Sequence, residues 1–203
     1  MNICRWMIVL VLSFFISCCT RAGTYSLPLR YQPSKEFPSL QQKIGPSLGI
    51  APIKDARPET LYIGIHTPLE GLPQRFKSEP FPLEKAIGDS LSGILSSYGV
   101  KTVPVSGWDG KPESLKDVGP DSVLRIEMKR FWAEGKAAPF QSNLKTSIYF
   151  VFHLGVKKEE KVFTRNVEIE REMTFFRITP ETVGTMINQI LTDIIDTFLL
   201  NPS

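Results

Sequence analysis

Three consecutive segments of the chain alternate apolar and polar residues, and this pattern restricts the fold more than any other feature of the sequence. The segments are residues 122–132, 146–156 and 162–175. Successive side chains of a β-strand point to opposite faces, so alternation is typical of strands with one buried and one solvated face. Turn-forming residues at 135–139 and 157–161 separate the segments. We therefore expect three antiparallel strands joined as a meander.

One face of these strands is expected to be buried and the other charged. The residues assigned to the buried face are Leu124, Ile126, Met128, Trp132, Ile148, Phe150, Phe152, Leu154, Val156, Phe163, Val167, Ile169, Met173 and Phe175. Lysines, arginines and glutamates fill many of the positions between them. Opposite charges on neighbouring strands are expected to pair across the solvated face.

Two other segments repeat apolar residues every three or four positions, which predicts amphipathic helices. The first covers residues 83–98, where Pro82 suits a first helical turn and Gly99 a helix stop. The second closes the chain, beginning after Thr179, a residue type that caps helix N-termini, and running through Leu199. We expect the apolar stripe of this last helix to lie across the sheet.

Shorter strands are expected at residues 48–53 and 100–105, and residues 61–66 form either a further short strand or an extended loop. This order of elements predicts an α+β fold, a two-layer sandwich in which a mostly antiparallel β-sheet of about four to five strands carries two helices packed on one face. The remaining length suffices for one domain, which we place at residues 47–203.

The first 20 residues carry the features of an export signal. Arg5 supplies a positive charge ahead of a mostly apolar run at residues 6–16. That run has the length of a signal-peptide core and is too short to cross a bilayer as a helix. We therefore expect a signal peptide at residues 1–17.

The end of this segment predicts a lipid anchor. Residues 15–18, Phe-Ile-Ser-Cys, resemble the lipobox of bacterial lipoproteins, in which a small residue precedes a cysteine that is lipidated and becomes the new N-terminus. We expect lipidation of Cys18, because Ser17 fits the small position. Cys19 is the alternative site, and an ordinary secretory signal that contains cysteines is the alternative interpretation.

Acyl chains such as palmitate on this cysteine would hold the protein at a membrane. In the lipoproteins that this segment resembles, Asp after the lipidated cysteine marks retention in the inner membrane. Cys19 stands there instead, so the resemblance implies the outer membrane, facing the periplasm, with the inner membrane as the alternative. Residues 18–46 contain four prolines and predict a tether. A short edge strand around Leu27 and Tyr31 is the alternative for part of it.

The positions of the cysteines and the small net charge indicate how the domain is stabilised and which partners it is not expected to bind. All three cysteines, Cys4, Cys18 and Cys19, precede the expected domain, so it is expected to fold around an apolar core without disulfides. Without the signal peptide, 23 basic side chains face 21 acidic ones. So small a net charge argues against a surface for polyanions, and nucleic acid is not an expected partner.

The sequence offers no convincing catalytic set. Its two histidines, His66 and His153, are far apart, and no metal-ligand spacing is present. Ser142 and Lys145 match the spacing of a Ser-x-x-Lys motif, but that motif needs a helix, and this stretch has the pattern of a strand start. We therefore expect no enzymatic activity, no cofactor and no metal site.

Four residues are candidates for contact with a partner. Asp55 and Arg57 follow an expected buried strand at a sharp exit, where they either pin the turn with their own side chains or meet a ligand. Trp108 and Phe140 stand in two expected long loops, residues 106–119 and 133–141. An aromatic residue on a loop either anchors a protein contact or covers an edge of its own core.

The order and spacing of several segments are similar to those of the YajG-like family of bacterial lipoproteins. The segments are the lipobox, Asp55-Ala56-Arg57-Pro58 after a strand, Ser97-Tyr98-Gly99-Val100 at a helix end, Asp121-Ser122-Val123-Leu124 at a strand start, and the terminal helix. This resemblance implies an envelope protein without catalytic residues. A weaker resemblance to LptE-like plugs and ABC-transport auxiliary subunits implies docking onto a larger membrane complex.

These observations lead to two hypotheses. The first is a non-enzymatic, membrane-anchored lipoprotein of the bacterial envelope that binds another envelope protein as an accessory of a transport or assembly system. The second is a lipoprotein that binds a lipid or another amphiphile between its helices and its sheet. The aromatic residues that motivate the second are Phe150, Phe152, Phe163, Phe175 and Phe176.

Overall fold

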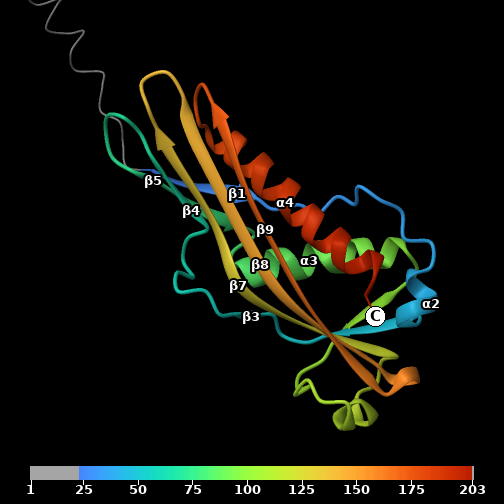
Figure 1. Cartoon of the computed structure of the whole chain (residues 1–203). Helices are drawn as coiled ribbons and strands as arrows, with labels where there is room; N and C mark the ends of the chain where they lie inside the picture. The colour runs from blue at the N-terminus through green and yellow to red at the C-terminus, as the bar shows by residue number, and fades with distance from the viewer. Residues whose placement is uncertain (1–22, 203) are drawn as a thin grey trace, which may run out of the picture.

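The computed structural model describes residues 23–202, and its central element is the long strand β7 (Ser122–Ala137). One edge of β7 pairs antiparallel with β8 (Ser142–Val156), which pairs antiparallel with β9 (Lys161–Phe175) (Figure 1). The expected meander is therefore confirmed. Its first strand is longer than expected, because β7 continues past residue 132 to Ala137 before the chain turns.

The other edge of β7 pairs with three short parallel strands in succession. They are β2 (Ser47–Ile50), β3 (Lys54–Asp55) and β4 (Gly64–Thr67). β4 continues antiparallel into β5 (Gln74–Glu79), and β5 pairs in parallel with β1 (Thr24–Pro28). β6 (Lys101–Pro104) pairs in parallel with β2. The result is one mixed sheet of nine strands.

Three α-helices accompany the sheet in the described residues: α2 (Leu40–Ile44), α3 (Leu83–Ser97) and α4 (Pro180–Leu200). Two 3₁₀ helices, Glu113–Asp117 and Lys157–Glu159, lie in the connections. Nine strands and three helices correct the prediction of a mostly antiparallel sheet of four to five strands with two helices on one face. The additional strands are two to six residues long, which is too short to establish a hydrophobic period.

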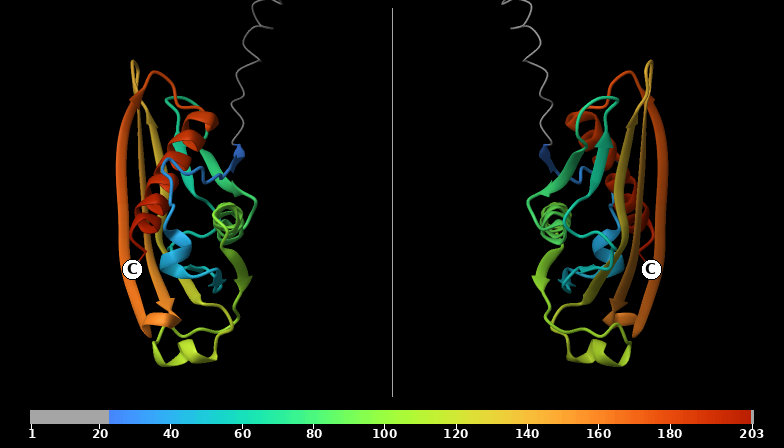
Figure 2. Two further views of the ribbon diagram at one scale, coloured as in Figure 1. Left: turned by 90° about the vertical axis from the view of Figure 1, so that its right-hand side faces the viewer. Right: turned by 90° about the vertical axis from the view of Figure 1, so that its left-hand side faces the viewer.

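Both predicted amphipathic helices are confirmed. α4 lies against the inner face of the long strands, and α3, viewed nearly end-on, packs beside β5 and β6 (Figure 2). The ring of Phe198 on α4 stacks on Phe152 of β8, with centroids 4.3 Å apart. The Thr179 hydroxyl accepts a hydrogen bond from the Thr182 amide and caps α4 as expected. By length and composition α4 qualifies as a membrane span, but 61% of its most apolar window is buried in this fold.

A β-bulge changes which side chains of β7 are buried. The register with β8 shifts between Met128 and Arg130, so an extra residue, Lys129, enters β7. Such a residue reverses the inward and outward alternation beyond it. Phe131 is consequently buried, and Trp132, expected on the same face as Leu124, lies on the opposite face.

The expected tether at residues 18–46 is not a linker over its described part, residues 23–46. Its start forms the edge strand β1, the alternative that the sequence left open. Six of its apolar side chains are buried in the core: Leu27, Leu29, Tyr31, Phe37, Leu40 and Ile44. The domain therefore begins near residue 24 and not at residue 47.

One carboxylate fastens this N-terminal segment to the last helix. Asp196 of α4 is 2% exposed and accepts a 2.7 Å hydrogen bond from the Tyr31 hydroxyl. It also accepts hydrogen bonds from the amide and the hydroxyl of Ser34, at 2.9 and 2.6 Å. Burial, together with the hydrogen bond to Asp196, raises the pKa of Tyr31 above its usual value.

The solvated face of the meander carries the expected cross-strand ion pairs. Arg130 of β7 lies 2.9 Å from Glu168 of β9, and Lys145 of β8 lies 2.7 Å from Glu170. Glu127 sits between basic neighbours, and the hydrogen bond from Lys129 contributes most to lowering its pKa below the usual value. Exposed pairs of this kind contribute little stability each, about 0–1 kcal/mol.

Candidate functional site

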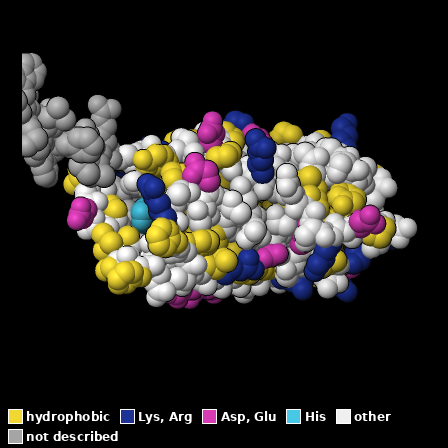
Figure 3. Space-filling view, turned by 90° about the horizontal axis from the view of Figure 1, so that it is seen from above, with side chains coloured by type: hydrophobic (Ala, Val, Ile, Leu, Met, Phe, Trp, Pro, Cys, Tyr) yellow, Lys and Arg dark blue, Asp and Glu magenta, His cyan; other side chains and the backbone are white. Residues whose placement is uncertain are grey.

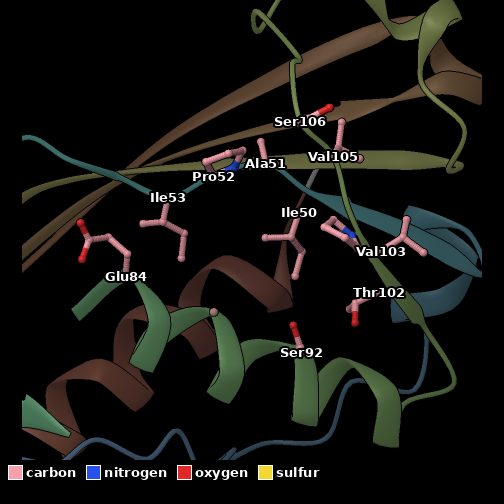
Figure 4. Close-up of a pocket in the computed structure, with 12 residues that line it drawn as sticks. Ile50, Ala51, Pro52, Ile53, Glu84, Ser92, Thr102, Val103, Val105 and Ser106 are labelled. Carbon is pink, nitrogen blue, oxygen red and sulfur yellow. The ribbon is translucent and has the colours of Figure 1, made fainter. Parts of the chain in front are cut away.

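An apolar groove of about 580 Å³ lies between helix α3 and the β2–β6 edge of the sheet (Figure 4). Its lining comes from the segment that begins at the end of β2, from α3 and from β6 with the two residues that follow it. The lining residues are Ile50, Ala51, Pro52, Ile53, Glu84, Gly88, Ser92, Thr102, Val103, Pro104, Val105 and Ser106.

The helical wall of the groove follows from the spacing of three residues on α3. Leu83, Ile87 and their neighbours on one stripe are buried in the core. Glu84, Gly88 and Ser92 are four residues apart, so they form the adjacent row along the helix. Gly88 has no side chain and Ser92 a small one, so this row leaves space that larger residues would fill.

The opposite wall is provided by branched apolar side chains of the sheet edge. Ile50 and Ile53 point from the β2 side toward α3, and Val103 and Val105 belong to the β6 side (Figure 4). The two isoleucines also pack against the main core, so this wall is held rigidly. A rigid apolar wall facing a row of small residues suits an extended apolar ligand or segment.

The polar groups of the groove lie near its ends. The Glu84 carboxylate stands at one end, and the Ser92 and Thr102 hydroxyls stand near the other (Figure 4). The lining contains no histidine, cysteine or lysine, and within residues 23–202 no group of acidic, histidine or cysteine side chains is arranged to hold a metal ion. The groove is open to solvent and presents an apolar surface that can select a ligand by shape, and its lining contains no acid–base pair.

Asp55 and Arg57 form the pinned turn that the sequence left as one of two interpretations. Their side chains are 6% and 2% exposed, and Arg57 Nη2 lies 2.7 Å from Asp55 Oδ2. All five N–H donors of the guanidinium are used, on both Asp55 oxygens and on the carbonyls of Thr60, Tyr62 and Phe131. Neither side chain is available to a partner, although a cavity of about 420 Å³ opens beside them.

The two candidate loop aromatics have opposite environments. Trp108 is 5% exposed and packs with Leu115 and Val123 in a small separate core, and its indole N–H donates to the Lys111 carbonyl. Its ring therefore covers part of the protein's own core and is not available for contact with a partner. Phe140 lies in the β7–β8 turn and is 89% exposed, so its role as a contact residue stays a prediction.

The residues considered for catalysis are not brought together. Ser142 is buried on one face of β8, whereas Lys145 lies on the other face beside Glu170. His153 is partly exposed, with Nδ1 2.9 Å from the Thr164 hydroxyl, and burial lowers its pKa below the usual value. His66 is buried in β4, with Nδ1 3.4 Å from the Gln74 side chain.

The aromatic residues that motivated a pocket inside the fold do not line one. Phe150 and Phe152 are fully buried in the core, and Phe163 and Phe175 pack against it. Phe176 is 90% exposed. Cys18 and Cys19, the lipidation candidates, lie outside the described residues.

Sequence reasoning missed the groove as a site. The relevant signal was present, since Gly88 and Ser92 place two small residues four positions apart on one row of the helix, beside the buried stripe. The partner wall is set by the parallel pairing of β2 with β6, across 54 residues of chain, which no local pattern encodes.

No family model matches the sequence, and no curated protein matches it. Among solved structures, protein XCC0632 from Xanthomonas campestris, described as DUF330, has a TM-score of 0.57 at 16% identity and covers 87% of this chain and 91% of its own. An uncharacterized protein has a TM-score of 0.51 at 14% identity, covering 89% and 98%. These similarities establish the fold alone.

A third structure, lipoprotein GNA1162 from Neisseria meningitidis, has a TM-score of 0.40 at 14% identity, covering 74% of this chain and 98% of its own. So low a score carries no argument about this protein. None of the three structures bears the YajG-like name, and that resemblance stays a prediction.

Proposed function

We propose that this protein is a membrane-anchored lipoprotein of the bacterial cell envelope that acts by binding and not by catalysis. Its role would be that of an accessory, protein-binding component of an envelope transport or assembly system. The observation that carries this proposal is the apolar groove beside the edge strand β6. The export and anchoring part rests on the N-terminal sequence, with Cys18 as the lipidated residue.

The edge strand sets what kind of partner segment fits. Within residues 23–202, β6 pairs with β2 alone. The amides of Lys101 and Val105 donate to the β2 side, so the backbone of Thr102 is directed outward. Pro104 has no N–H and cannot extend a ladder. A partner would therefore form few strand hydrogen bonds here and would bind mainly through apolar side chains placed in the groove.

A second candidate function is binding of an amphiphile in the same groove. It is supported by the separation of apolar walls from a single carboxylate, Glu84, at one end (Figure 4). An acyl chain would contact Ile50 and Val103, and the carboxylate would suit an amine in the headgroup. In this case the ligand would be a lipid of the ethanolamine type.

Site-specific photo-crosslinking in the intact envelope distinguishes these functions. A photoreactive residue at position 102 is expected to give one discrete protein adduct, whereas the same residue at position 166, exposed on β9, gives none. Ser92→Leu, which fills the groove, should abolish the adduct. Asp89→Leu on the exposed face of the same helix should not.

The outcomes separate clearly. A lipid adduct at position 102, lost in Ser92→Leu, would favour the amphiphile. An adduct that Ser92→Leu leaves unchanged, or no adduct of either kind, would contradict a binding role for the groove.

A further inference from the structure

Three loops and the start of the described chain lie at one end of the molecule. The strand register brings them together, because Thr67 of β4 pairs with Lys136 of β7, and His66 pairs with Gln74 of β5. The β4–β5 loop, residues 68–73, is thus beside the β7–β8 turn, residues 138–141. The β9–α4 loop, residues 176–179, begins at the same end of the sheet, because Phe175 at the end of β9 pairs with Ser142 at the start of β8. We call these three segments the apical loops (Figure 1).

β1 begins at the same end. It runs parallel to β5, and its first residue, Thr24, pairs with Arg75. Thr24, at the start of β1, therefore lies beside the apical loops, and not at the opposite end, where residues 105–121 lie (Figure 1).

Large exposed apolar side chains concentrate at this end. Four of them are on the apical loops: Leu69 is 60% exposed, Leu72 56%, Phe140 89% and Phe176 90%. In the view from above, hydrophobic side chains gather at the end of the molecule that carries the apical loops (Figure 3). Within residues 105–121, at the other end of the molecule, no large apolar side chain is exposed. An apolar concentration of this kind marks an interaction surface.

The length of the intervening chain holds this end close to a membrane. Only residues 19–23 separate Cys18 from Thr24, and a fully extended chain of that length reaches about 20 Å. This step rests on the proposed lipidation of Cys18. Because β1 is paired into the sheet, no longer tether is available to move the apical loops away from the bilayer.

The charge of the apical loops favours apolar insertion over electrostatic attraction. Their charged residues are Glu70 and Arg177, which cancel. Two aromatic and two leucine side chains on loop tips are the residue types that enter the boundary between headgroups and acyl chains.

We propose that the apical loops lie in the membrane interface and insert Phe140, Phe176, Leu69 and Leu72 into the lipid surface. The acyl anchor and these side chains together fix the orientation of the domain. The long strands then project away from the bilayer and carry the other end, with Trp108 and residues 105–121, into the aqueous compartment.

Depth-dependent fluorescence quenching tests this orientation on the full lipidated protein. Single cysteines at positions 140 and 176, and at exposed position 116 as the matched control at the opposite end, are introduced with Cys19→Ser and labelled with an environment-sensitive dye. The mature protein is inserted by its anchor into vesicles of phosphatidylethanolamine and phosphatidylglycerol. A fraction of added phosphatidylcholine carries a spin label on its acyl chain.

The dyes at positions 140 and 176 are expected to shift to the blue and to lose intensity to the quencher, and the dye at 116 to do neither. The result should be the same in vesicles of phosphatidylcholine alone and at high salt, because the loops carry no net charge.

Protein that floats with the vesicles but shows equal quenching at 140, 176 and 116 would overturn the proposal and leave the anchor intact. The apical loops would then face a protein partner. Protein that does not float would overturn the lipid anchor itself and, with it, this inference.

Discussion

Asp196 is the residue whose replacement tests most sharply how the N-terminal segment is held. Asp196→Ala removes the acceptor of three hydrogen bonds, from the Tyr31 hydroxyl and from the amide and hydroxyl of Ser34. Tyr31 is 4% exposed, so its hydroxyl, left without a partner, costs about 1–3 kcal/mol. Ser34 is exposed and regains water, so its two bonds contribute less.

Removal of a buried carboxylate also removes its own desolvation cost, which offsets part of the loss. We expect a net decrease in the free energy of unfolding of about 1–3 kcal/mol. Urea unfolding of the purified protein measures it. Hydrogen exchange should also show faster exchange in residues 24–36 than in β8, because the mutation frees that segment first.

Asp193→Ala is the matched control on the same helix. Asp193 pairs with Arg171 at 2.9 Å, but both side chains are about 40% exposed, so its loss should cost at most about 1 kcal/mol. Equal urea midpoints for the two variants would refute the claim that a buried carboxylate fastens the N-terminal segment.

Three further predictions concern packing and pH. Gly155→Ala should destabilise the protein by about 1–3 kcal/mol, because the added methyl group overlaps the Leu115 side chain; unchanged urea unfolding would show that this loop yields. Gly88→Ala should instead stabilise α3 by about 0.5–1 kcal/mol, since its nearest neighbour, Ile53 Cδ1, is at 3.7 Å, and a lower melting temperature would contradict this. Because its pKa is raised, Tyr31 stays protonated in the folded state at pH values at which it ionises in the unfolded chain. The stability that it contributes is therefore lost as pH rises above about 10. Tyr31→Phe should flatten the fall in stability there, and an unchanged slope would count against the buried hydroxyl.

The parts of the fold that the sequence predicted are those in which a local period extends over many residues. β8, β9, α3 and α4 are each 15 residues or longer, and the buried faces of β8, α3 and α4 are confirmed. On β9 only Val167 of the expected face is fully buried, and Met173 is 41% exposed, because within residues 23–202 β9 pairs with β8 alone and its end lies beyond the cover of the core. The short strands β2 and β6 were expected, at residues 48–53 and 100–105, but no local period predicts that they pair in parallel. β3 has two residues, too few to show any period.

Other differences arise from contacts that are distant in sequence. The hydrogen bond between Tyr31 and Asp196 joins residues 165 positions apart, so the proline-rich segment around Tyr31 has the composition of a tether and yet packs into the core. One extra residue at Lys129 moves Trp132 to the other face, and a bulge has no reliable sequence signature. The environment of the loop aromatics was likewise left open, and they differ because Trp108 packs with Leu115 and Val123, whereas Phe140 lies at the tip of the β7–β8 turn and is 89% exposed.

The proposed place of the protein in the envelope and the orientation of its apical loops both require that its N-terminus holds it at a membrane. Intact mass spectrometry of the mature protein, purified from membranes, measures this directly. We predict a chain that begins at Cys18 and carries acyl groups, with the modification retained in Cys19→Ser and lost, together with membrane association, in Cys18→Ser. An unmodified mature chain recovered in the soluble fraction would contradict the account.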